Sequence, residues 1–364
     1  MMVAMRDGIV ITTGARLHFG FFAHRPLAES MIARTSAVSA GGLLEQANYG
    51  GVGLMIDSPG FVLAALRSDR DRIVCPARTT SRDPSSSPSA DSTSQFDRIG
   101  SRVAHLVGQY RHSCPSARQP PGCAIEIRRI IPRHSGLGSG TQLAMAVAQV
   151  LALLSADGQA DATTLAQRVA RGKRSAIGIH GFARGGFLVD AGKRSTDDIG
   201  RLVARADAPG DWRFLLVTPA DSSGTGLSGQ EEVDALERLP EMPLALTERL
   251  CRLALLEMLP ALGESDIERF GEAMFEFGRS VGEYFRPVQG DAYADPCMAD
   301  LVHWLRRQGV RGVAQTSWGP TIAVCCGDAE RAKSLQDQIL ADGRWKHCQT
   351  LIASPLNTGA AIQL

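Results

Sequence analysis

The sequence lacks a charge excess of either sign, because 39 Lys and Arg residues are set against 38 Asp and Glu residues. Such a balance supplies no global field that would favour a nucleic-acid backbone or an anionic membrane, so we expect neither partner. Any anion must therefore be bound locally by particular residues. The apolar fraction of 44% and the 364-residue length fit a globular protein with room for two domains.

Paired cysteines are also missing, since the eight cysteines form no C-x-x-C motif and two of them, Cys325 and Cys326, are adjacent. This usage suits neither a zinc knuckle nor a secreted disulfide framework. No apolar run reaches the ~18 residues that span a bilayer, and residues 1–20 contain no uninterrupted apolar core of a signal peptide. The sequence therefore predicts a cytoplasmic protein with reduced thiols.

The common nucleotide motifs are absent from the one loop that otherwise suits a phosphate. Residues 131–154 read IPRHSGLGSGTQLAMAVAQVLALL, with no Walker lysine and with Thr141 where a G-x-G-x-x-G motif needs its last glycine. The glycines nevertheless let the backbone approach a ligand, and the start of an apolar helix presents N–H groups to an anion. The alternative is a tight turn that only packs a strand on a helix. The predicted substrate-binding residues of this loop are Ser135, Gly136, Gly138, Ser139, Gly140 and Thr141.

Short strand-like runs dominate the first third of the chain, and amphipathic helices dominate the last third. Between them, residues 75–97 are rich in Ser, Pro, Asp and Arg and are predicted to form a flexible surface insertion. Near Trp212 the pattern of predicted secondary structure changes to alternating helices and paired strands. This pattern favours a second α+β domain of ferredoxin-like kind. We predict domains at 1–207 and 208–364.

Three further segments contain side chains suited to an active site. Arg16 and His18 alternate on one face of a predicted strand, where they can bind a carboxylate or phosphate or move a proton; a solvated outer face is the alternative. Residues 171–184 are basic and precede Asp190, as a site for a magnesium-bound polyphosphate requires; a solvated helix end is the alternative. Residues 315–321, QTSWGPT, could form an aromatic wall for a planar ring, or simply a hairpin turn with a buried tryptophan.

Together the strings GARLHFG, GGVGLMID, IPRHSGLGSGTQ, GGFLVDAG and SWGPT resemble the GHMP kinase superfamily, and within it the β-ribofuranosylaminobenzene 5'-phosphate synthase family. Kinases of the superfamily usually read P-x-x-x-G-L-G-S-S-A, whereas Gly140 and Thr141 here are similar to the synthase version. The resemblance implies a two-domain GHMP-kinase-like α+β fold. Its N-terminal domain would be ribosomal protein S5 domain 2-like and its C-terminal domain ferredoxin-like.

The resemblance also implies a reaction and its site. Phosphoribosyl pyrophosphate would condense with 4-aminobenzoate or 4-hydroxybenzoate, with release of CO2 and pyrophosphate, in tetrahydromethanopterin biosynthesis and thus one-carbon metabolism. Magnesium dependence and a homodimer are implied as well. We predict Asp190, Arg16 and His18 as catalytic residues, with Asp190 also binding the metal. The predicted substrate-binding residues outside the loop are Lys173, Arg174, Ser317 and Trp318.

Two other functions fit parts of the sequence. An ATP-dependent small-molecule kinase is compatible with the general loop chemistry, although the second loop serine of the kinases is missing here. A non-catalytic paralogue that only binds a ligand is the other alternative. Three outcomes distinguish these functions. A kinase forms ADP from ATP, and a synthase releases CO2 and pyrophosphate from phosphoribosyl pyrophosphate and a benzoate. A non-catalytic paralogue binds its ligand without forming either set of products.

Overall fold

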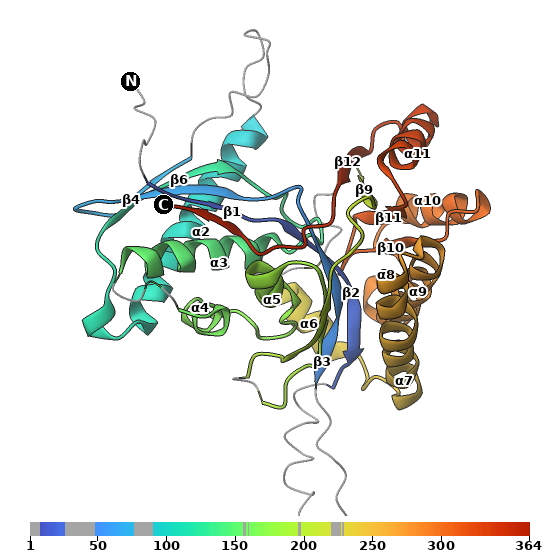
Figure 1. Ribbon diagram of the computed structural model, residues 1–364, viewed down its shortest axis with the longest axis horizontal. Coiled ribbons are helices and arrows are strands. Elements are labelled where there is room, and N and C mark those ends of the chain that lie inside the picture. The colour runs from blue at the N-terminus through green and yellow to red at the C-terminus, as the bar shows by residue number, and fades with distance from the viewer. Residues whose placement is uncertain are drawn as a thin grey trace, which may run out of the picture.

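The computed structural model describes residues 8–25, 48–75, 90–155, 158, 160–195, 198–219, 227 and 229–364 (Figure 1). Its first sheet has the strand order β13-β1-β4-β6-β5. Its strands are β1 (Ile9–Thr12), β4 (Val62–Arg67), β5 (Arg72–Val74), β6 (Cys123–Arg129) and β13 (Ala361–Gln363). Only β5 and β6 pair in parallel within this sheet.

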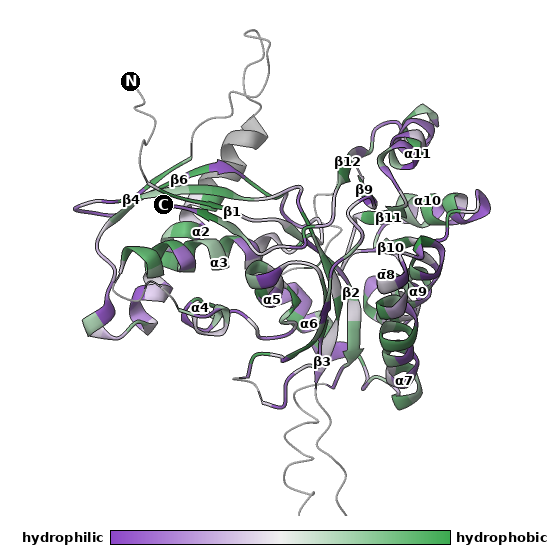
Figure 2. Ribbon diagram, viewed as in Figure 1, coloured by the Kyte–Doolittle hydropathy of each residue, from purple (hydrophilic) through white to green (hydrophobic). Residues whose placement is uncertain are grey.

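Helix α3 (Ser139–Leu154) packs against β1, β4 and α2 (Ala90–Ser113). It is apolar nearly all round, and most of its residues from Gln142 to Leu154 are buried, as expected of an all-apolar helix. Figure 2 shows this helix coloured largely hydrophobic. Its N-terminus consequently begins inside the molecule rather than at a free edge.

The second sheet has the order β2-β3-β7-β8 and contains β2 (Ala15–Ala23), β3 (Tyr49–Ile56), β7 (Phe187–Asp190) and β8 (Leu202–Ala206). Helices α4 (Ala162–Arg168) and α5 (Ile177–Arg184) precede β7, and α5 packs on β2, β3 and β7. Strand β2 is also in contact with α9 (Ile267–Gln289), so both of its faces are covered. A solvated outer face for Arg16 and His18 is therefore excluded.

The third sheet confirms the ferredoxin-like prediction. Its strands β9 (Arg213–Thr218), β10 (Val313–Gln315), β11 (Ile322–Cys326) and β12 (Gln349–Ala353) lie in the order β10-β11-β9-β12, with every neighbouring pair antiparallel. With α11 (Ala329–Ala341) joining β11 to β12, this is the topology of a split βαβ fold.

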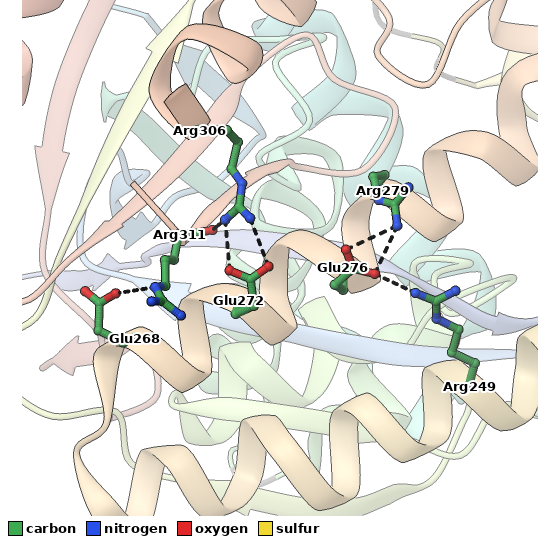
Figure 3. A network of polar contacts seen from close by, with 7 residues as sticks. All are labelled: Arg249, Glu268, Glu272, Glu276, Arg279, Arg306 and Arg311. Atoms are coloured by element: carbon green, nitrogen blue, oxygen red, sulfur yellow. Dashed lines mark hydrogen bonds and ion pairs between the residues drawn. The ribbon is translucent and has the colours of Figure 1, made fainter. Parts of the chain in front are cut away.

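The remaining helices are the 3₁₀ helix Ser116–Arg118, α6 (Gln230–Arg238), α7 (Leu244–Arg252), the π-helical turn Leu253–Met258, α8 (Leu259–Glu264) and α10 (Pro296–Arg307). Three glutamates of α9 form ion pairs with one arginine of the same helix and with three arginines of neighbouring segments (Figure 3). Glu268 pairs with Arg311 at 2.8 Å, Glu272 with Arg306 at 2.9 Å, and Glu276 with Arg279 at 3.1 Å and Arg249 at 2.5 Å. The spacing of four residues places the three carboxylates on adjacent turns.

The last strand of the chain belongs to the first sheet. Strand β13 pairs with β1, with Val10 opposite Gln363, so the last strand lies in the N-terminal sheet although the rest of 208–364 does not (Figure 1). The division at 207/208 stays a prediction. Part of the predicted insertion at 75–97 is wrong, because α2 begins at Ala90; residues 76–89 lie outside the described part of the chain.

No helix in the described residues is long and apolar enough to cross a membrane.

Candidate active site

The loop between β6 and α3 packs against the turn that follows β10. His134, Gly136 and Gly138 have φ of 56°, 73° and 73°, the left-handed region that glycine tolerates best. A Cβ at Gly136 would lie 2.2 Å from the carbonyl oxygen of Thr316, so no larger residue fits there. At this position the glycine permits a close approach to protein backbone rather than to a ligand.

The start of α3 offers hydrogen-bond donors that the protein does not use itself. Gly138 is the N-cap residue and supplies no side chain to the first turn, and the N–H groups of Ser139 and Gly140 have no partner within the described residues. The hydroxyls of Ser139 and Thr141 are likewise without a partner there. Such an N-terminus attracts an anion through its N–H groups and dipole. The predicted anion site at this loop remains a prediction that this geometry supports.

Four hydrogen bonds fix β2, the loop and the turn after β10 together. The Arg16 N–H donates to the Leu137 carbonyl at 3.0 Å, and the Ser317 N–H donates to the His18 carbonyl at 2.7 Å. The Thr316 hydroxyl accepts from the His18 N–H and donates to the Gly136 carbonyl, each at 3.0 Å. These bonds bring together Arg16 and His18, the loop, and the turn at 315–321, which are three separate segments of the sequence.

Arg16 directs its guanidinium along the loop. A Cβ at Gly138 would lie 3.2 Å from Arg16 Nε, and this Nε is buried without a hydrogen-bond partner in the described structure. Burial lowers the pKa of Arg16 to about 10; the charge of Glu232 opposes this shift and that of Arg174 adds to it. The side chain is therefore still a cation at neutral pH, with a donor free for a carboxylate or phosphate.

His18 is 2% exposed, and its Nε2 lies 3.1 Å from the Ser175 hydroxyl oxygen. Burial, followed by the charge of Arg16, holds the pKa of His18 well below its ordinary value. The imidazole is consequently neutral at pH 7 and is not paired with a carboxylate. It can accept or donate one hydrogen bond, but it does not add a positive charge to the site.

Asp190 does not fit the predicted role of metal ligand. Its Oδ2 accepts the Ala176 N–H at 2.7 Å and its Oδ1 accepts the Gly192 N–H at 2.8 Å. The side chain is fully buried, and a Cβ at Gly200 would lie 2.2 Å from Oδ1, so this residue closes the space around the carboxylate. Burial raises the pKa of Asp190, and the two N–H bonds oppose that rise. The carboxylate anchors the start of α5 to β7, and a metal ion cannot reach it in this arrangement.

The two predicted cations after α4 have different surroundings. Lys173 is exposed, whereas Arg174 pairs with Glu232 of α6 at 2.7 Å. The other oxygen of Glu232 accepts a hydrogen bond from Trp318 Nε1 at 3.0 Å. Arg174 is thus neutralised within the protein, which its position in the sequence did not indicate.

Trp318 is wrongly predicted as a stacking surface for a substrate ring. It is 3% exposed and stacks on Phe285 of α9, with ring centroids 4.1 Å apart and planes at 15°. Ser135 is equally enclosed, and its hydroxyl donates to the Pro132 carbonyl at 2.8 Å. Ser317 reaches the site through its backbone, as described above. These three residues hold the loop and turn in shape.

Sequence reasoning missed several charged residues at this site. Arg102 comes from α2, Arg133 from the loop, Arg171 from the segment after α4, and Glu232 from α6. A Cβ at Gly140 would lie 2.9 Å from Nη2 of Arg102, which places that guanidinium at the first turn of α3. Arg171 lies in the basic run at 171–184 and Arg133 in the loop segment 131–154, both of which carried a signal, whereas no motif marked Arg102 or Glu232.

The described residues contain no group of three or more His, Cys, Asp or Glu side chains that could hold a metal ion. Together with the enclosed carboxylate of Asp190, this leaves the predicted magnesium without a ready protein ligand set among them.

Two segments of the chain match models of known protein families. The GHMP kinases N terminal domain matches residues 101–186, which include the loop and α3, and the GHMP kinases C terminal domain matches residues 258–344. The chain is thus similar to GHMP kinases in both of these segments. The predicted fold class is thereby confirmed, and mevalonate pyrophosphate decarboxylase from Streptococcus pyogenes shares the fold, with a TM-score of 0.61, 13% identity, and 98% and 99% of the two chains covered.

The chain is also similar to archaeal proteins named beta-ribofuranosylphenol 5'-phosphate synthase. The protein from Methanothermobacter thermautotrophicus is 34% identical over 208 residues, 54% of this chain and 61% of that protein. The one from Archaeoglobus fulgidus is 27% identical over 335 residues, 86% of this chain and 92% of that protein. The chain thus spans less than two thirds of the length of the first relative and most of the length of the second. The predicted resemblance to this synthase family is confirmed.

Proposed function

We propose that this protein condenses phosphoribosyl pyrophosphate with 4-hydroxybenzoate or 4-aminobenzoate, forming a C-riboside 5'-phosphate with release of CO2 and pyrophosphate. The observation that carries the proposal is a site with unpartnered cationic and N–H donors, in which Asp190 and Glu232, the carboxylates found there among the described residues, are occupied by hydrogen bonds or an ion pair within the protein. The archaeal relatives are named for a ribofuranosylphenol 5'-phosphate, which is the product that the hydroxy acceptor would give.

The chemistry explains why such a site suffices. The C1–oxygen bond to pyrophosphate breaks, and the electron pair leaves with pyrophosphate. The ring carbon that bears the carboxylate then bonds to C1, because a para hydroxyl or amino group makes that carbon electron-rich. The bond to the carboxylate breaks next, and its electron pair restores aromaticity as CO2 leaves. CO2 rather than a proton departs from the ring, so no base is needed at this carbon.

The protein has to bind anions, orient the two substrates and stabilise the leaving pyrophosphate. The N-terminus of α3 and the hydroxyls of Ser139 and Thr141 offer uncharged donors, and Arg16 offers a buried cation. Arg16 and neutral His18 are assigned to the benzoate carboxylate or to the ribose 5'-phosphate. Asp190 serves this site by fixing the start of α5, next to Ser175.

Magnesium is proposed to enter as a complex with the diphosphate of the substrate. Oxygen ligands from phosphates and water commonly complete the coordination of this ion. The proposal requires no ligand role for Asp190, whose oxygens are occupied by backbone N–H groups.

A kinase is the second candidate, because homoserine kinase from Methanopyrus kandleri is 28% identical over 239 residues, 62% of this chain and 70% of that protein. Incubation of the purified protein with magnesium and each substrate set separates the two. We expect pyrophosphate from phosphoribosyl pyrophosphate only when a benzoate is present, and no ADP from ATP with homoserine. ADP formation without pyrophosphate release would overturn the proposal in favour of the kinase.

Both acceptors belong in the same experiment. We expect 4-hydroxybenzoate to support turnover, given the phenol in the relatives' name, and the ratio of kcat/KM for the two acceptors decides the assignment. Binding of both compounds without any product would identify the non-catalytic alternative.

A further inference from the structure

His18 and Ser175 are in contact at the candidate site, although they lie 157 positions apart in the sequence. The Nε2 atom of His18 lies 3.1 Å from the Ser175 hydroxyl oxygen. Gly53 of β3 is paired opposite His18 of β2. A Cβ at Gly53 would lie 2.7 Å from Cγ2 of Ile177, so this glycine lets the start of α5 come close to the sheet. The close approach of α5 brings Ser175 within reach of His18.

The segment that carries Ser175 is restrained by two hydrogen bonds. The Ser175 hydroxyl oxygen accepts the Ile177 N–H at 3.2 Å. The N–H of Ala176, between these two residues, donates to Oδ2 of Asp190 at 2.7 Å and so anchors the start of α5 to β7. The direction of both bonds is certain, because a backbone N–H can only donate. They hold the Ser175 hydroxyl beside His18.

The contact between the two side chains assigns the proton of the imidazole. The Ser175 hydroxyl has one hydrogen to donate, and His18 Nε2 is the acceptor that it meets within the described residues. A neutral imidazole carries its proton on one nitrogen and accepts at the other. When Ser175 donates to Nε2, the proton is on Nδ1, which meets no acceptor of the protein in the described part of the chain. Nδ1 is therefore the nitrogen left for a ligand.

The charge on this side of the site suits a monoanion. Arg16 and His18 lie two residues apart on β2, so their side chains leave the same face of the strand. Arg16 is a cation at neutral pH, whereas burial, followed by the charge of Arg16, lowers the pKa of His18 and keeps it neutral. The charge of Arg174 is offset by Glu232. One net positive charge balances a carboxylate, whereas a phosphate monoester carries about −1.5 to −2 charges at pH 7.

We propose that Ser175 is a positioning residue: its hydroxyl donates to Nε2 of His18 and holds the imidazole proton on Nδ1, which donates to a carboxylate of the substrate. Arg16 supplies the charge that this carboxylate requires, and His18 supplies a directed, uncharged donor. The identity of the carboxylate as that of a benzoate rests on the proposed function, whereas the tautomer of His18 does not. Of the two ligands proposed above for Arg16 and His18, this arrangement selects the benzoate carboxylate over the ribose 5'-phosphate.

Nitrogen NMR of the isotope-labelled protein measures the tautomer directly, because a protonated and a bare ring nitrogen differ widely in chemical shift. His18→Gln identifies the His18 signals among those of the eight histidines. At neutral pH we expect the proton on Nδ1 in the wild-type protein and a mixture of both tautomers in Ser175→Ala. Ser175→Thr keeps the hydroxyl and should keep the proton on Nδ1. A proton on Nε2 in the wild-type protein overturns the proposal, whether or not the variants fold.

Steady-state kinetics of the same variants tests which substrate His18 binds. A donor that binds the carboxylate equally in the ground state and the transition state changes KM rather than kcat. We expect Ser175→Ala to raise KM for 4-hydroxybenzoate about tenfold, with kcat and KM for phosphoribosyl pyrophosphate within a factor of about two. Ser175→Thr should recover most of the loss. Ser334→Ala is the matched control, because exposed Ser334 on α11 also accepts a side-chain hydrogen bond, from Gln338.

Different results overturn different parts of the proposal. An unchanged tautomer and an unchanged KM in Ser175→Ala overturn the positioning role. A raised KM for phosphoribosyl pyrophosphate, with that for 4-hydroxybenzoate unchanged, overturns the carboxylate as the ligand of His18. A tautomer that depends on Ser175, in a protein that does not turn over phosphoribosyl pyrophosphate, overturns the proposed function and leaves the positioning role in place.

Discussion

The indole nitrogen of Trp318 donates a hydrogen bond to Glu232 at 3.0 Å, and this contact places a carboxylate beside the cations of the candidate site. The second oxygen of Glu232 pairs with Arg174 at 2.7 Å. The charge of Glu232 also acts on Arg16, whose pKa is lowered by burial. Glu232 therefore reduces the positive charge that Arg174 and Arg16 present to an anionic substrate.

Replacing this carboxylate should strengthen anion binding. Glu232→Gln keeps an oxygen for Trp318 but removes the negative charge, so we expect Kd for inorganic pyrophosphate to fall about threefold at low salt and less at high salt. Glu231→Gln, an exposed neighbour on the same helix, should change it little. Weaker binding in Glu232→Gln would show instead that Glu232 positions Arg174 for the ligand.

Removal of the buried guanidinium of Arg16 should lower the activity strongly. Arg16→Ala removes a cation preorganised beside the loop but retains the backbone bond to Leu137, so kcat/KM should fall by roughly a hundredfold, about 3 kcal/mol. Arg25→Gln, just beyond the same strand and paired with Glu241 at the surface, is the control. Turnover of Arg16→Ala within a factor of about two of wild type contradicts the assignment.

The carboxylate of Asp190 should matter for stability rather than for metal binding. Asp190→Asn turns one acceptor into a donor that faces the N–H of Ala176 or Gly192, so the free energy of unfolding should drop by about 2 kcal/mol. Urea unfolding measures this loss, and Asp198→Asn, an exposed carboxylate that also accepts a backbone N–H, should lose less. Unchanged stability together with a higher magnesium requirement would restore Asp190 as a metal ligand.

Buried His18 should make stability depend on pH. Burial, with the charge of Arg16, holds its pKa far below 6.5, so below that pH the unfolded chain takes up a proton that the folded protein refuses. Its contribution is therefore present above pH 6.5 and is lost as pH falls, by up to about 1.4 kcal/mol per pH unit.

Denaturant unfolding at pH 7.5 and pH 5.5 measures this effect. The loss of stability on acidification should be smaller in His18→Gln than in wild type, whereas exposed His303→Gln should match wild type. The pKa of His24 is also lowered, mainly by burial, so part of the dependence should remain in His18→Gln. An identical loss in His18→Gln and wild type would mean that His18 is charged in the folded protein.

Local pattern was enough to predict β2, the loop, α3 and the ferredoxin-like sheet, because periodicity and glycine spacing act over a few residues. The partners of individual side chains were not predictable in the same way. Phe285, which stacks on Trp318, lies on a different element. The groups that bind the Asp190 carboxylate are backbone N–H groups, and the sequence does not indicate which backbone groups a side chain will meet. Arg102 reaches the loop from α2 through packing alone, and no motif links the two.

The proposed reaction transfers a phosphoribosyl group to a ring carbon at this loop, and no phosphate group is transferred. The direct measurement uses 4-hydroxybenzoate labelled at the carboxyl carbon, with phosphoribosyl pyrophosphate and magnesium, and counts labelled CO2 and pyrophosphate in one reaction. We predict one CO2 for each pyrophosphate, and loss of both products in Arg16→Ala. Pyrophosphate without CO2, or ADP from ATP with neither, would contradict the account.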